Sequence, residues 1–67
     1  MVGCFVLYQQ YDDGARGPVF AQGDMSIVVL KVRAMRLLAK PDPSHPLGVF
    51  YVGAEKDVYV IDFVLDP

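Results

Sequence analysis

The chain has 67 residues, of which 54% are hydrophobic and 21% charged, and it carries a formal net charge of -2 at pH 7. This length predicts one small domain over residues 1–67, since a domain of ~60 residues buries only about 60% of the surface that its unfolded chain exposes. The high hydrophobic content excludes intrinsic disorder. Cys4 is the only cysteine, which excludes a disulfide within the chain and a multi-cysteine metal site in one copy.

The first third of the chain predicts two strands. Residues 2–11 are rich in β-branched and aromatic residues and end at the turn signal of residues 12–14, Asp-Asp-Gly. A short apolar stretch at residues 19–21 follows Pro18 and predicts a brief edge strand, because a proline has no backbone donor for a ladder.

Residues 24–40 are compatible with two structures. Asp24 as a cap, basic residues toward the C-terminal end and Pro41 after it favour a helix over residues 24–40. The β-branched residues Ile27, Val28, Val29 and Val32 favour a strand, because a helix restricts their side chains. We expect a strand over residues 25–33, with the helix as the alternative.

The last part of the chain predicts a β-hairpin. Residues 47–52 and 58–65 are apolar, and the polar residues 53–57 between them have the length of a hairpin connection. Residues 41–46 contain three prolines and predict a stiff surface loop.

These elements together predict a mainly β fold with a small antiparallel sheet of four or five strands. The sheet is either open or closes toward a barrel. The alternative is an α+β fold in which a helix at residues 24–40 packs on an antiparallel sheet. No stretch of the chain carries the signature of a family.

The predicted strands are apolar on both faces, whereas a half-solvated antiparallel sheet alternates. So short a chain has little material to cover two faces, so we expect self-association, with a closed barrel as the alternative explanation. The expected oligomer interface lies on the last strand and comprises Val58, Val60, Asp62, Phe63 and Val64.

Charge is segregated along the chain. Residues 25–40 hold four cations and no acid, whereas residues 41–67 have a formal charge of -4. The cations are expected to contact an anion or a partner protein, and they are Lys31, Arg33, Arg36 and Lys40. The alternative function is a small β-barrel-like nucleic-acid-binding protein that uses residues 31–40, with the tyrosines as stacking surfaces.

The sequence contains no EF-hand loop, P-loop, dinucleotide-binding fingerprint or histidine-glutamate metal motif, so we expect no enzyme activity, no cofactor and no metal site. Cys4 lies in an apolar strand and is expected to be a small buried hydrophobe, and His45 is expected to be a solvated loop residue. Asp62 lies among apolar neighbours and is expected to pair with a cation of the block at Lys31, Arg33 or Arg36.

The predicted function is therefore that of a non-catalytic interaction or adaptor protein. Its first expected partner is a second copy of itself, then another protein, with nucleic acid less favoured. No uncharged apolar run reaches the ~18 residues of a membrane span, and the single cysteine favours the cytoplasm.

Overall fold

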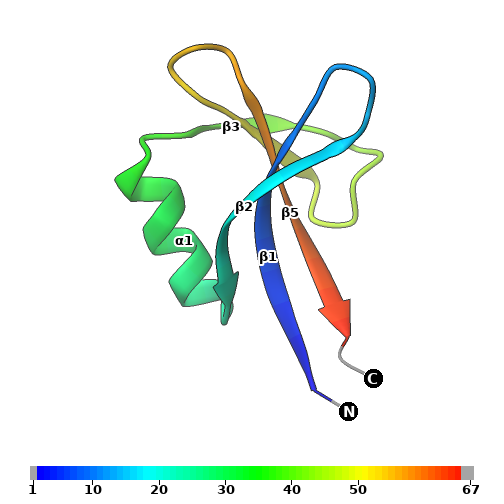
Figure 1. Ribbon diagram of the computed structural model, residues 1–67, viewed down its shortest axis with the longest axis vertical. Coiled ribbons are helices and arrows are strands. Elements are labelled where there is room, and N and C mark those ends of the chain that lie inside the picture. The colour runs from blue at the N-terminus through cyan, green and yellow to red at the C-terminus, as the bar shows by residue number, and fades with distance from the viewer. Residues whose placement is uncertain (1, 66–67) are drawn as a thin grey trace.

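The computed structural model describes residues 2–65 and shows a mainly β protein with one short helix (Figure 1). Residues 1, 66 and 67 lie outside the described part of the chain. The elements, in chain order, are β1 (Gly3–Gln10), β2 (Arg16–Gly23), α1 (Met25–Ala34), β3 (Leu38–Pro41), β4 (Val49–Val52) and β5 (Val58–Leu65). The strands form one sheet in the order β2-β1-β5-β4-β3, and all neighbours are antiparallel.

The first strand and the C-terminal hairpin are confirmed. β1 ends where the turn signal was found, and the N–H of Tyr11 donates to the carbonyl of Ala15 to close the β1–β2 hairpin. The β4–β5 hairpin is closed by the N–H of Gly53, which donates to the carbonyl of Asp57. The second strand is longer than predicted and covers Arg16–Gly23.

The strand expected at residues 25–33 is wrong, because Met25–Ala34 form the helix α1. Val28 and Val32 are four residues apart, so they lie on one face of the helix, and both are buried against the sheet. Burial of these side chains outweighs the small helix penalty of β-branched residues, which is at most about 0.7 kcal/mol each. The α+β alternative is consistent with this fold.

The helix ends earlier than the predicted position 40. Arg36 has φ 55°, and the N–H groups of Arg36 and Leu37 donate to the carbonyls of Arg33 and Val32. This is a Schellman cap, with arginine in the left-handed position that glycine usually takes. Leu37 then packs against the core under the helix, so the chain turns away and continues as β3.

The strand β3 was not predicted, and the sheet does not close. β3 is exposed throughout and pairs with β4 from Leu38 opposite Val52 to Pro41 opposite Val49. β2 and β3 are the two outer strands of the sheet, so closure into a barrel is not observed. Pro41 is tolerated here because an edge strand needs no donor on its open side.

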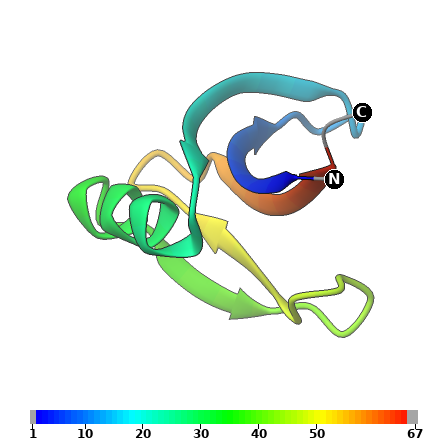
Figure 2. The same ribbon diagram turned by 90° about the horizontal axis from the view of Figure 1, so that it is seen from below.

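The core has one part on each face of the sheet. On the helix side, Val28 and Val32 pack with Leu7, Tyr59 and Ile61. The other face holds a smaller cluster of Val6, Tyr8 and Val60. Figure 2 shows that α1 lies beside the strands and that the sheet curls strongly, which encloses part of the second face. Within one copy, the helix side and the curled second face thus cover part of the apolar surface of β1 and β5.

We expect Val28→Ala to lower the free energy of unfolding by about 2 kcal/mol, because it leaves a cavity at a fully buried position. Chemical denaturation monitored by circular dichroism measures this change. Leu30→Ala is the matched control in the same helix, because the Leu30 side chain is 63% exposed and its truncation is expected to cost less than about 0.5 kcal/mol. Equal losses for the two variants would contradict the observed helix orientation.

Candidate functional site

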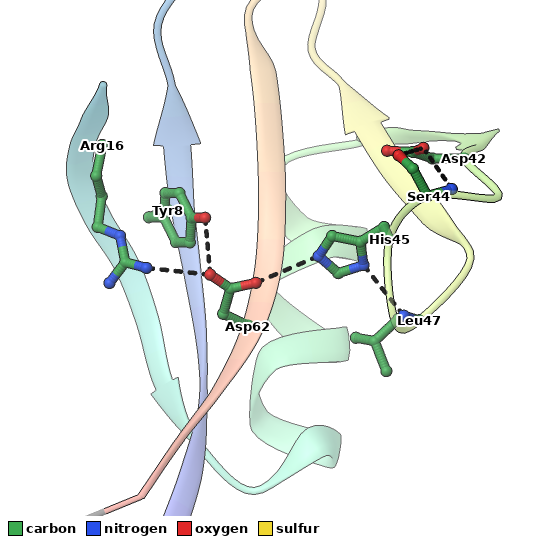
Figure 3. A network of polar contacts seen from close by, with 7 residues as sticks. All are labelled: Tyr8, Arg16, Asp42, Ser44, His45, Leu47 and Asp62. Atoms are coloured by element: carbon green, nitrogen blue, oxygen red, sulfur yellow. Dashed lines mark hydrogen bonds and ion pairs between the residues drawn. The ribbon is translucent and has the colours of Figure 1, made fainter. Parts of the chain in front are cut away.

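A polar cluster surrounds the carboxylate of Asp62 on β5 (Figure 3). One of its oxygens, Oδ2, accepts hydrogen bonds from the Tyr8 hydroxyl at 2.8 Å and from the Arg16 guanidinium at 3.0 Å. The other, Oδ1, lies 3.2 Å from Nε2 of His45. The four side chains come from β1, β2, β5 and the loop between β3 and β4, so one carboxylate connects four segments of the chain.

The sheet positions three of these side chains. Asp62 is opposite Val6 in the β1–β5 ladder, and Tyr8 is two residues along β1, so both side chains lie on the same face. Arg16 begins β2 opposite Gln10. Its guanidinium lies 4.1 Å from the centre of the Tyr8 ring, a cation–π contact that holds the charge beside the phenol.

His45 is positioned by its own loop. The backbone N–H of His45 donates to the carbonyl of Asp42, and the N–H of Gly48 donates to the carbonyl of His45. Asp42 also accepts two bonds from Ser44, from its N–H at 3.2 Å and its hydroxyl at 2.6 Å. The prolines and these turn bonds hold the loop in a shape that directs the imidazole to Asp62.

Both imidazole nitrogens of His45 are engaged. The N–H of Leu47 donates to Nδ1 at 3.1 Å, so Nδ1 carries no proton in this arrangement. The proton of a neutral ring is therefore on Nε2, which donates it to Asp62. A general base needs a free lone pair directed at a substrate. The Nδ1 lone pair of His45 already accepts the hydrogen bond from Leu47, so it does not face a substrate in this arrangement.

Burial and charge change the acidity of the cluster's phenol. The pKa of Tyr8 is raised above its usual value, first by burial and then by the hydrogen bond to Asp62 and the negative charge of Asp62, while Arg16 acts in the opposite direction. The pKa of Tyr59, on the other face, is also raised, by burial and then by the charges of Asp57 and Glu55.

Two expectations about this region are wrong. The cation expected to pair with Asp62 was one of Lys31, Arg33 and Arg36, but the structure pairs it with Arg16. The sheet order brings the start of β2 close to β5 across β1, a proximity that no local pattern reveals. His45 was expected to be solvated, but its side chain is only 13% exposed. The sequence signal for this cluster is a charged residue within an apolar strand. It identifies Asp62 but not its partners Arg16 and His45.

The residues expected at an oligomer interface occupy different environments. Val60 is buried within the single copy, and Val58 is half-buried. Asp62 is bound to its own cluster. Phe63 and Val64 are 54% and 36% exposed, so they are accessible to a second molecule. Cys4 is half-buried and packs beside the cluster of Val6, Tyr8 and Val60.

The expected anion or partner contacts are all exposed. Lys31 and Arg33 lie in the last turn of α1, where cations complement the helix dipole. Arg36 is in the helix cap, and Lys40 is in β3. Of the tyrosines proposed as stacking surfaces, Tyr8 and Tyr59 are buried, so their rings offer no open face to a base.

A cleft of about 450 Å³ is lined by residues near the tips of the β1–β2 and β4–β5 hairpins; the two tips are at the top of Figure 1. It is lined by residues 9–13 and 56–58, which include three aspartates and one lysine. Within residues 2–65, no group of three or more His, Cys, Asp or Glu side chains is placed to hold a metal ion. The same part of the chain contains no helix with the length and apolarity needed to cross a membrane.

Comparison of this chain with protein-family models, with curated proteins and with solved structures gives no match. The fold and the side-chain geometry therefore carry the functional argument.

Asp62→Asn is expected to lower the pKa of Tyr8 toward its usual value, because the variant removes the negative charge and weakens the acceptor beside the phenol. The ultraviolet absorbance of phenolate during an alkaline titration measures this change, and Tyr8→Phe identifies which part of the curve belongs to Tyr8. Burial stays in place, so part of the upward shift persists. An unaltered titration of Tyr8 in the Asn variant would contradict the contact.

The stability of the fold is expected to decrease at alkaline pH. Both Tyr8 and Tyr59 have raised pKa values when folded, so above pH ~10 the unfolded chain loses protons that the folded chain retains. Their contribution to stability is complete below pH ~10 and is lost as the pH rises through the folded values. Thermal unfolding across this range tests the prediction, and Tyr8→Phe should weaken the dependence.

Proposed function

We propose that the chain is a non-catalytic interaction module that associates with a second copy of itself. One observation carries the proposal. Large apolar side chains remain exposed at the end of the molecule where β1 begins and β5 ends (bottom of Figure 1), and they are Val2, Phe63, Val64 and Leu65 at 72%, 54%, 36% and 57%. Exposed apolar residues that lie together mark interaction sites more often than isolated ones do.

The site geometry supports a non-catalytic role. The His45–Asp62 pair resembles a catalytic pair most, but its polar atoms already have partners within the chain. Leu47 donates to Nδ1 of His45, and Tyr8 and Arg16 donate to Asp62. The hydrogen bonds among these residues connect strands and a loop, which is a structural task. Cys4 packs in the apolar cluster, where a thiol serves as a small hydrophobe. A half-buried free thiol also fits the reducing cytoplasm, which we include in the proposal.

The alternative is nucleic-acid binding through residues 31–40, and one observation favours it: the four cations there are all exposed. Two features count against nucleic-acid binding: the sheet is open, and Tyr8 and Tyr59 are buried. Single-strand binding combines a basic groove with exposed aromatic rings. This function would show as binding of an oligonucleotide that weakens steeply with salt and with Arg33→Ala.

Light scattering on a sizing column, at several protein concentrations and at low and high salt, tests self-association. We expect a mass above the 7.4 kDa of one chain that persists in high salt, because apolar contacts are not screened by ions. An assembly that dissociates in high salt would instead indicate contacts between the basic and acidic blocks. The mass of a single chain under all conditions would overturn the proposal.

A further inference from the structure

His45 closes its own turn with its side chain and binds β5 with the same ring. The N–H of Leu47, two residues along the chain, donates to Nδ1 of His45 at 3.1 Å. On the other side of the ring, Nε2 lies 3.2 Å from Oδ1 of Asp62. Figure 3 shows the imidazole between these two partners. The ring therefore connects the turn of residues 45–47, which we call the His45 turn, to the last strand.

The two contacts respond in opposite ways to a proton. Nδ1 accepts a hydrogen bond only while it has a free lone pair, so the contact with Leu47 requires the neutral ring. Protonation places a hydrogen on Nδ1 that faces the N–H of Leu47, and two donors then meet. Nε2 carries a hydrogen in both states, and its contact with Asp62 becomes charge-assisted in the protonated ring. A proton thus removes one contact and strengthens the other.

The exposure of the two contacts decides which one is retained. The bond from Leu47 lies at the surface, and Leu47 itself is 41% exposed, so its released N–H is free to bind water. The contact with Asp62 is partly buried, and the side chain of His45 is only 13% exposed. Charge-assisted hydrogen bonds are about twice as strong as neutral ones. The protonated ring is therefore expected to stay on Asp62 and to release Leu47.

The charges around the ring come from several elements. Asp62 of β5 is the charged group that contacts the imidazole within residues 2–65, and it also binds Arg16 of β2 and the hydroxyl of Tyr8 of β1. Protonation changes the cluster from one anion and one cation to one anion and two cations. The side chain of Arg16 is 52% exposed, so water screens the added charge. The remaining titratable or charged side chains in the loop or on this side of the sheet are Cys4, Lys40 and Asp42.

The other hydrogen bonds of the loop do not involve the ring. Backbone bonds connect Asp42 with His45 and with Gly48, and a further one runs from the N–H of Gly48 to the carbonyl of His45. Pro46 has a fixed φ, so a rotation of the peptide unit between Pro46 and Leu47 is the smallest movement that releases the N–H. The opening is therefore confined to residues 46–47, and the ends of the loop stay closed.

We propose that His45 is a proton-controlled switch of the β3–β4 loop: its protonation opens the His45 turn at Leu47 while the imidazolium stays on Asp62. Histidine is the side chain whose charge ordinarily changes between about pH 5 and 8. The two states differ in how the loop presents Leu47, an apolar side chain at the surface. A change of charge that biases an element between two arrangements is the general form of such switches. This inference goes beyond the proposed self-association and does not rest on it.

A nuclear magnetic resonance titration of the isotope-labelled chain from about pH 8 to about pH 5 tests the switch. His45 is the only histidine, so the imidazole signals need no assignment by mutation. We expect the neutral ring to carry its proton on Nε2, and the amide proton of Leu47 to move upfield along the same curve as the ring gains a proton. The amide of Ser44, which donates to Asp42 and not to the ring, is the internal control and is expected to stay in place.

His45→Asn removes the titration and keeps the turn. The side-chain oxygen of asparagine accepts from the N–H two residues on, as in an Asx turn, and so replaces Nδ1. We expect the amide proton of Leu47 in this variant to keep the position of the closed turn over the whole pH range. His45→Ala is the matched control without an acceptor, and its Leu47 amide is expected in the position of the open turn at every pH.

Four results would overturn the switch. The ring remains neutral down to about pH 5; the ring titrates but the amide of Leu47 does not follow it; or Leu47 still responds to pH in His45→Asn. The fourth is a matching change at Tyr11 and Gly53, whose amides close the two hairpins, because acid would then alter the whole sheet. The readout is the loop itself and not the molecular mass, so failure of the switch and failure of self-association are distinguishable.

Discussion

Strands β1 and β5 pair along their whole length, and every other element is attached to this pair. The ladder joins the first and last described strands of the chain, from Gln10 opposite Val58 to Gly3 opposite Leu65, so it forms only when residues far apart in the sequence meet. β2 extends it on one side, β4 and β3 extend it on the other, and α1 packs on one of its faces through Val28 and Val32. The pair is apolar on both faces because both faces lie against other parts of the molecule over most of its length.

Asp62 is the carboxylate in that ladder, and the cost of placing it there is offset by hydrogen bonds from three other segments of the chain. A carboxylate in an apolar strand is unfavourable unless its oxygens accept hydrogen bonds. Tyr8, Arg16 and His45 supply them. Because His45 comes from a loop with two prolines and its own turn bonds, the cluster also holds that loop against β5. The three hydrogen bonds to Asp62 thus connect β1, β2 and the β3–β4 loop to β5.

The two ends of the molecule differ in the character of their exposed side chains. The hairpin tips carry most of the acidic turn residues and the open cleft, whereas the opposite end presents uncharged apolar side chains. Arg16 and Pro18 lie on β2, and Lys40 and Pro41 lie on β3, so both outer strands carry a charge and a proline.

Local pattern was sufficient for β1, for the β4–β5 hairpin and for the apolar excess on both of their faces, because strand composition and turn residues act over a few neighbouring positions. It was insufficient for residues 25–40. There, the β-branched residues favour a strand locally, and burial of Val28 and Val32 on a sheet assembled from distant segments reverses the preference. The same holds for the partners of Asp62: its need for a cation can be inferred from its neighbours in the chain, but Arg16 and His45 reach it only because the sheet order places β2 and the β3–β4 loop beside β5. Interactions between neighbours in the chain depend on residue type and spacing, whereas these contacts depend on which strands become adjacent, and that is decided by the burial of the whole sheet.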